Sequence, residues 1–144
     1  MRKIAIIGAG SIVFCKTFML DIMGTKALED TQFALMAPSK TKTPYVEAFA
    51  RRVIERNDLK SEVYITTDMR DALEGAKYVI ATFQVGGVTA FEYDYKIPLK
   101  YGVDQCIGDT LGPGGIFRAL RSIPVAMEMA RLVEELCPDA VILN

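Results

Sequence analysis

Apolar residues follow two alternating patterns along the chain, and each pattern predicts a different kind of secondary structure. Continuous apolar runs of three to six residues indicate strands that are buried on both faces. Between these runs, apolar residues recur at every third or fourth position, which is typical of helices with one buried face. The alternation predicts an α/β fold with a doubly wound parallel sheet. The predicted strands are residues 3–8, 32–36, 63–65, 78–82 and 140–143.

The helical pattern appears in four segments: residues 11–23, 44–57, 68–75 and 125–136. Pro44 suits the first turn of its helix, Asp68 can cap the next helix, and Gly24 can end the first one. In the first helix we expect the large apolar residues to face the sheet. These are Phe14, Phe18, Leu20 and Ile22.

The first predicted strand runs directly into a glycine turn at Gly8 and Gly10, and a helix follows. In parallel α/β sheets this arrangement places a dinucleotide pyrophosphate at the N-terminus of the helix. The third glycine of the usual fingerprint is missing, and an ordinary strand–turn–helix is the alternative interpretation. The turn predicts a Rossmann-like nucleotide-binding fold. Its candidate cofactor contacts are Gly8, Gly10, Ser11, Ile12, Val13 and Phe14.

The segment after the second strand, residues 37–42, has no acidic residue. A dinucleotide site usually has Asp or Glu there, which binds the ribose hydroxyls. Ser39 can bond a ribose hydroxyl, and Lys40 or Lys42 can pair with a 2′-phosphate. The segment therefore favours NADP or a less selective nucleotide site, and a solvated turn is the alternative.

Two further segments are candidates for contact with a ligand. Val85, Gly86 and Gly87 follow the fourth strand, where paired glycines permit a close approach of the backbone, and a turn into the next helix is the alternative interpretation. Residues 112–115 contain three glycines and a proline ahead of a helical pattern, and we expect them to form a turn. Asp109 precedes that turn and can exchange a proton or bind sugar hydroxyls. Alternatively, Asp109 is a helix cap, and Arg118 and Arg121 form surface ion pairs.

Composition narrows the possible functions. The chain has 144 residues, 51% of them hydrophobic, and a net charge of −1, which suits a single globular domain. Neither a basic excess nor a long apolar run is present, so we expect no nucleic-acid or membrane partner. Three cysteines without a C-x-x-C pair favour the reducing cytoplasm. The absence of histidine excludes Ser-His-Asp catalysis and zinc sites built on imidazole from this chain.

Specific segments of the chain resemble the N-terminal part of the NAD-dependent family 4 glycoside hydrolases. The matching segments are residues 7–11, 83–87, 98–103, 109–121 and 135–139, so the resemblance covers essentially the whole chain. Within the family the chain is most similar to the melibiase-type α-galactosidase and α-glucosidase branch. The phosphoglycosidase branches tend to have Gln-Glu-Thr where this chain has Gly108-Asp109-Thr110.

The resemblance implies a reaction that begins with redox chemistry, outside the usual two-carboxylate scheme. NAD⁺ takes a hydride from C3 of the sugar, a base removes the C2 proton, the C1–O bond breaks by elimination, and water adds before the hydride returns. A divalent metal, usually Mn²⁺, polarises the C3 oxygen. The resemblance implies an α-hexoside substrate: an α-galactoside first, then an α-glucoside or α-galacturonide. It also implies a homo-oligomer.

The resemblance also assigns roles to particular residues. Val85, Gly86 and Gly87 match the segment that passes the nicotinamide, and Asn144 matches a strand end that contacts cofactor or sugar. Asp109 matches an acidic position near the substrate and is the candidate for assisting the leaving group.

The chain departs from the family pattern in three ways. Ala37, Pro38 and Ser39 replace the acidic residues after the second strand. The sequence stops at Asn144, ahead of the family's metal ligands, its tyrosine-type base and its second domain. Without histidine or a suitable cysteine pair, the chain cannot hold the metal as the family does, so it is a fragment, or a partner completes it, or it is inactive. We therefore expect residues 1–144 to be the cofactor-binding domain of a longer family chain, without its second domain and inactive alone. The alternatives are an NAD(P)-dependent oxidoreductase domain of the lactate/malate dehydrogenase type and a non-catalytic nucleotide-binding module.

Overall fold

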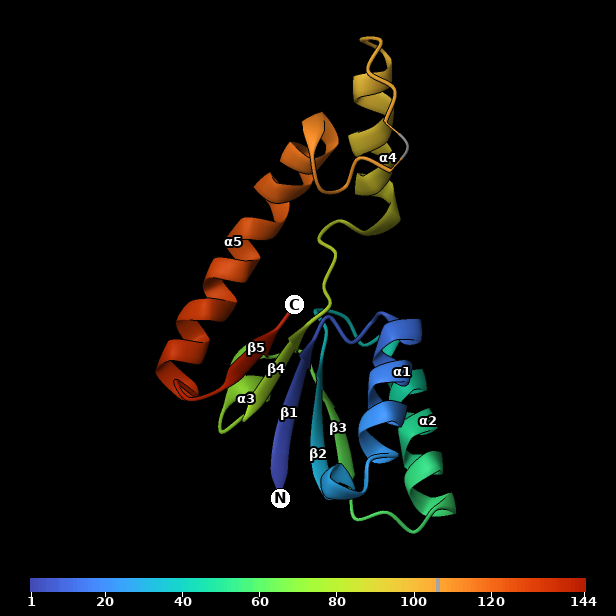
Figure 1. Cartoon of the computed structure of the whole chain (residues 1–144), viewed down its shortest axis with the longest axis vertical. Coiled ribbons are helices and arrows are strands. Elements are labelled where there is room, and N and C mark those ends of the chain that lie inside the picture. The colour runs from blue at the N-terminus through green and yellow to red at the C-terminus, as the bar shows by residue number, and fades with distance from the viewer. Residues whose placement is uncertain (106) are drawn as a thin grey trace. The chain divides into compact units, whose positions relative to one another are not determined.

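Five parallel strands form one sheet in the computed structural model, which describes residues 1–105 and 107–144 (Figure 1). Along the sheet the strands follow the order β3-β2-β1-β4-β5. The order reverses beside β1, and ligands of doubly wound sheets bind at such a reversal, outside the carboxyl ends of the strands. The predicted fold class is confirmed. The strands are β1 (Arg2–Ile7), β2 (Thr31–Met36), β3 (Glu62–Thr66), β4 (Tyr78–Ala81) and β5 (Val141–Leu143).

The chain divides into two compact units. The first, here called the sheet unit, comprises Met1–Phe83 and Arg131–Asn144. The second, the helical unit, comprises Gln84–Ala130. None of the described helices is long and apolar enough to cross a membrane.

Helices α1 (Ile12–Met23) and α2 (Thr43–Arg56) cover one face of the sheet (Figure 1). Alternate residues of a strand point to opposite faces, so Ile4 and Ile6 of β1 pack in the cluster with α1 and α2. Lys3 lies on the other face, and its ammonium donates to two carbonyls at the end of α3 (Met69–Leu73). A short 3₁₀ helix, η1 (Lys26–Leu28), precedes β2.

The sequence analysis predicted the buried face of α1 only in part. Its buried residues are Cys15, Met19 and Met23, whereas Phe14 and Leu20 are exposed. Of the residues expected to face the sheet, only Phe18 and Ile22 pack against the core, and they do so partly buried. Met19 and Met23 thus occupy the buried face of α1 that the larger Phe14 was expected to occupy. Methionine suits such a position because its flexible side chain adapts to irregular gaps.

The predicted helix ends are confirmed. Asp68 accepts a hydrogen bond from the Arg70 backbone N–H at 2.9 Å and so caps α3. Pro44 lies in the first turn of α2. The Gly24 N–H donates to the Leu20 carbonyl at 2.8 Å, although Gly24 keeps right-handed dihedral angles.

The secondary structure of the helical unit was predicted less accurately than that of the sheet unit. It contains α4 (Gly87–Leu99) and most of α5 (Gly112–Leu136). The start of α4 agrees with the alternative interpretation of Gly86 and Gly87 as a turn into a helix, although the extent of that helix was not predicted. Residues 112–115 were expected to form a turn before a helix, but the structure places them in the first turn of α5. Proline is tolerated there because the first N–H groups of a helix have no partner within it. Added side chains at Gly114 and Gly115 would collide with the carbonyls of Gly108 and Thr110, so glycine is needed where this loop packs against the helix.

Candidate functional site

The glycine turn after β1 is held by backbone groups on two sides. The N–H groups of Gly8 and Ala9 both donate to the Met36 carbonyl at 2.9 Å, and the Thr82 N–H donates to the Ile7 carbonyl at 2.8 Å. Gly8 has φ +97°, a conformation that L side chains rarely adopt. A Cβ on Gly8 would lie 2.5 Å from the backbone nitrogen of Phe83. Gly8 is therefore the residue that lets β1 turn sharply beside the end of β4.

The start of α1 has the features of an anion site. Among the described residues, no side chain caps the helix at Ser11. The first N–H groups of the helix, those of Ile12, Val13 and Phe14, therefore remain available to an external acceptor. An added Cβ on Gly10 would meet no described atom within 4 Å, so space adjoins this part of the turn.

The missing third glycine of the fingerprint has a structural explanation. That glycine normally permits close packing of the helix on the strand. Val13 occupies its place here, and the residue is 69% exposed, so its side chain points away from the sheet. Phe14 is also 61% exposed and stacks against Phe18 at a centroid distance of 6.3 Å. A side chain at this position therefore does not separate α1 from the sheet.

The carboxyl ends of the strands bring two more predicted residues to this edge of the sheet unit. Ile7 is paired with Met36 and with Ala81, so β1, β2 and β4 end at the same level. Ser39 lies three residues beyond Met36, is exposed, and contacts the Thr41 hydroxyl at 2.7 Å. Asn144 directly follows β5 and is exposed.

The remaining predicted site residues belong to the helical unit. Val85, Gly86 and Gly87 form the turn into α4, and both glycines have positive φ, +82° and +60°. Asp109 is partly exposed and accepts from the Arg118 guanidinium at 3.0 Å. The ion pair expected of Arg118 is thus present, and its partner is Asp109 itself.

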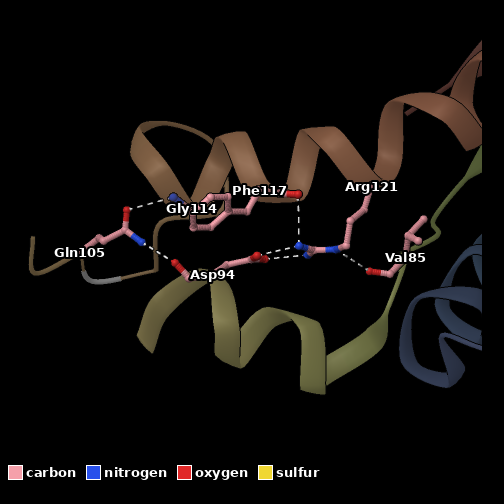
Figure 2. A network of polar contacts seen from close by, with 6 residues as sticks. All are labelled: Val85, Asp94, Gln105, Gly114, Phe117 and Arg121. Atoms are coloured by element: carbon pink, nitrogen blue, oxygen red, sulfur yellow. Dashed lines mark hydrogen bonds and ion pairs between the residues drawn. The ribbon is translucent and has the colours of Figure 1, made fainter. Parts of the chain in front are cut away.

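Arg121 does not form the surface ion pair that was the alternative expectation for it. Its guanidinium binds both carboxylate oxygens of Asp94, at 2.6 and 2.7 Å, and Asp94 is only 2% exposed (Figure 2). The hydrogen bonds that Arg121 donates to the Asp94 carboxylate raise the pKa of Arg121 above its ordinary value. Sequence reasoning did not single out Asp94. In the sequence, only its position could have indicated Asp94: it is an acidic residue in a segment rich in apolar residues, three positions after Phe91.

Neither buried cysteine thiol is activated for chemistry. Burial raises the pKa of Cys15 to about 12, so this thiol stays protonated at neutral pH. The pKa of Cys137 is also raised by burial, partly offset by the charge of Lys3. Cys106 lies outside the described residues. Within residues 1–105 and 107–144, no three Cys, Asp or Glu side chains gather where they could hold a metal ion.

Comparison with known proteins identifies relatives across the whole chain. A model of the family described as "Family 4 glycosyl hydrolase" matches residues 3–144. An alpha-galactosidase of Rhizobium meliloti is 46% identical over 99% of this chain and 29% of its own length. An alpha-galactosidase of Bacillus subtilis is 40% identical over 100% of this chain and 34% of its own. The chain thus spans about a third of the length of these relatives.

Solved structures of the same family are also similar to this chain. A 6-phospho-beta-glucosidase of Thermotoga maritima, solved with manganese, NAD⁺ and glucose 6-phosphate, is 30% identical with a TM-score of 0.84. The match covers 100% of this chain and 34% of that one. A lactate dehydrogenase of Eimeria maxima has a TM-score of 0.64 at 18% identity, which shows a shared fold alone. The fold, the family match and the sequence identities together show that this chain belongs to the family 4 glycosyl hydrolases.

Proposed function

We propose that this chain binds the NAD cofactor of a glycoside hydrolase that also depends on a divalent metal. The observation that carries the proposal is the turn at Gly8. The turn leads into α1, whose first N–H groups have no side-chain cap, and open space lies beside Gly10. The family relative from Thermotoga maritima, which was solved with NAD⁺ and manganese, supports the proposal.

The pyrophosphate is the part of the cofactor that the Gly8 turn suits best. Gly10 leaves room for a phosphate, and the N–H groups of Ile12, Val13 and Phe14 in the first turn of α1 are oriented to donate to its oxygens. The Ser11 N–H already donates to the Gly8 carbonyl at 3.1 Å, so Ser11 is proposed to contribute its hydroxyl. The positive end of the helix dipole adds to this attraction. In the full enzyme, bound NAD⁺ would accept a hydride from the sugar and later return it.

The nucleoside parts have their own candidate contacts. The exposed Ser39 hydroxyl suits a ribose hydroxyl, and neither Asp nor Glu stands near it in residues 37–42 to repel a 2′-phosphate. NADP is therefore an open alternative to NAD. Val85, Gly86 and Gly87 are proposed to contact the nicotinamide, and Asn144 the cofactor or the sugar.

Asp109 is proposed to assist departure of the leaving group. Its carboxylate is bound by Arg118 in this structure, so proton donation requires that this ion pair loosen when substrate arrives. Replacement by asparagine keeps the shape and removes the exchangeable proton. Asp109→Asn should therefore lower kcat for substrates with poor leaving groups more than for activated aryl glycosides.

The described residues do not supply a metal site, so we assign no step to manganese through them. We propose that this 144-residue chain alone does not hydrolyse glycosides.

The substrate of the full enzyme is proposed to be an α-hexoside, and first of all an α-galactoside, because two alpha-galactosidases are 46% and 40% identical to this chain. A cytoplasmic location and a homo-oligomer are proposed with it. The free thiols of Cys15 and Cys137 suit a reducing compartment.

Calorimetric titration of the purified chain with NAD⁺, NADP⁺ and ADP-ribose tests the binding function. We expect saturable binding of at least one dinucleotide. Absence of binding by all three would overturn the proposal and leave a structural role. Hydrolysis of a nitrophenyl α-galactoside, with and without NAD⁺ and Mn²⁺, then tests the activity of a family member that carries this domain.

A further inference from the structure

Among the described residues of the helical unit, one carboxylate is buried, that of Asp94, whose position on α4 places it against α5 (Figure 2). A buried carboxylate is costly unless a partner satisfies it. Arg121 of α5 supplies two parallel N–H groups at 2.6 and 2.7 Å, the bidentate geometry that only a guanidinium provides. This pair fixes α4 and α5 at one defined register within the helical unit.

The same guanidinium also binds the turn that leads into α4. Its Nε donates to the Val85 carbonyl at 3.3 Å, and one terminal nitrogen donates to the Phe117 carbonyl at 3.1 Å. Arg121 thus makes four hydrogen bonds, and a guanidinium has five N–H groups in a rigid plane. Because the plane is rigid, the carboxylate that orients the guanidinium also sets the direction in which it holds Val85.

Gly86 lies beside the same arginine. The position of an added Cβ on Gly86 lies 3.6 Å from Nε of Arg121 and collides with Cβ of Ala90. The turn can therefore follow its left-handed path, at φ +82°, only with glycine there.

Asp94 is itself held from a second direction. The Gln105 amide donates to the Asp94 backbone carbonyl at 3.0 Å and accepts from the Gly114 N–H at 3.4 Å (Figure 2). Gly108 and Gly114 both pack so closely on Gln105 that a Cβ on either would collide with it. Gln105, in the loop before α5, thus connects Asp94 of α4 with the first turn of α5.

We propose that the Asp94–Arg121 pair is a positioning device that fixes the backbone of Val85 and Gly86 for contact with the nicotinamide. This inference rests on the proposed cofactor-binding function. A buried ion pair is weak evidence for stability, because well-packed apolar residues often stabilise as much. Its directed hydrogen bond to Val85 is what an apolar pair would not provide. Arg121 and Asp94 act through the turn and do not themselves contact the cofactor.

ADP-ribose separates this role from a general effect on the fold, because it has the pyrophosphate of NAD⁺ but no nicotinamide. The affinities of NAD⁺ and ADP-ribose are measured by calorimetry for the wild-type chain and for Arg121→Lys, which keeps the charge but not the planar fork. We expect Arg121→Lys to weaken NAD⁺ binding roughly tenfold, the effect of about 1.4 kcal/mol, while ADP-ribose affinity stays within about twofold. Arg131→Lys, which changes an exposed arginine of α5, is the matched control and should change neither affinity.

A second variant covers the possibility that Arg121→Lys does not fold. Asp94→Asn keeps the shape of the side chain but removes its charge and one acceptor, so we expect the same selective loss of NAD⁺ affinity. If either variant loses NAD⁺ and ADP-ribose affinity in proportion, the pair is structural only and the inference is wrong. The inference is equally wrong if wild-type protein binds NAD⁺ and ADP-ribose equally well, although pyrophosphate binding would then stand. Failure of the wild-type chain to bind either ligand would instead contradict the proposed function itself.

Discussion

The two glycine turns of this chain are held in place by different kinds of contact. The turn at Gly8 in the sheet unit is fixed by backbone groups: two N–H groups on the Met36 carbonyl, and the main chain of Phe83 beside Gly8. The turn at Gly86 in the helical unit is bound by a side chain, through the hydrogen bond from Arg121 to Val85. The first turn is therefore set by the sheet, and the second depends on residues far away in sequence.

This difference predicts where each turn is sensitive to mutation. A backbone-held turn tolerates changes in neighbouring side chains but not in its own glycine, because the main chain that surrounds it cannot move without disturbing the sheet. A turn held by a side chain can be altered through that side chain alone. Four substitutions, from the largest expected effect to the smallest, test how the first turn is held and how the ionisable groups of the sheet unit contribute to stability.

Replacement of Gly8 by alanine should have the largest effect. The new Cβ would lie 2.5 Å from the Phe83 nitrogen at a residue with φ +97°. Strain of this kind costs about 1–3 kcal/mol for the dihedral angles alone, and the collision adds to it. We expect the free energy of unfolding in urea to fall by about 3 kcal/mol or more. A loss below about 1 kcal/mol would show that the sheet does not fix this turn.

Replacement of Gly10 by alanine in the same turn should weaken NAD⁺ binding and leave the stability of the fold nearly unchanged. An added methyl group meets no described atom within 4 Å, so unfolding free energy should stay within about 0.5 kcal/mol of wild type. The methyl group would occupy the space proposed for the pyrophosphate. We therefore expect NAD⁺ affinity to fall roughly tenfold or more, as measured by calorimetry. Unchanged affinity would place the pyrophosphate elsewhere.

The two units also differ in the ionisable groups they bury. Asp94 in the helical unit is paired, whereas burial raises the pKa of Cys15 in the sheet unit from 9.0 to about 12. The folded state holds this proton more tightly, so its stabilising effect is complete below pH 9 and declines between pH 9 and 12. The slope from one thiol is about 1.4 kcal/mol per pH unit. Urea unfolding at several alkaline pH values should show a shallower decline for Cys15→Ala, and an identical decline would contradict this cause.

The smallest effect is expected at the exposed ion pair between Arg70 and Glu135 in the sheet unit. The hydrogen bond from Arg70 lowers the pKa of Glu135, so any stabilisation exists above the ordinary carboxylate range and disappears as the pH falls through the lowered value. Exposed pairs contribute little. Glu135→Gln should shift Tm by less than about 2 °C at pH 7. A shift well above about 2 °C would show that this exposed pair does stabilise the fold.

The sheet unit could be predicted from the sequence because its signals are local. Apolar runs mark all five strands, and Gly8, Pro44 and Asp68 each mark a turn or helix end by their own chemistry. The error in α1 concerned which apolar face is buried. There, residue size suggested Phe14, and packing against the sheet instead selected Cys15 and the methionines.

The helical unit could not be predicted to the same extent, because its structure depends on contacts between distant residues. The exposed residues of α4 include several large apolar side chains, so its pattern has no clear polar face, and Pro98 lies in its last turn. The pairing of Asp94 with Arg121 joins residues 27 positions apart, which no spacing rule for a single helix indicates. Arg121 was noted as a charged residue, but its partner could be identified only in three dimensions.

The most direct test of the central claim is amide NMR of the ¹⁵N-labelled chain during titration with NAD⁺. If the first glycine turn binds the pyrophosphate through backbone N–H groups, the amide signals of Ile12, Val13 and Phe14 should show the largest shifts and saturate together. They should shift similarly with ADP-ribose, which contains the same pyrophosphate. Saturable binding of NAD⁺ that leaves these three signals unmoved would contradict the claim.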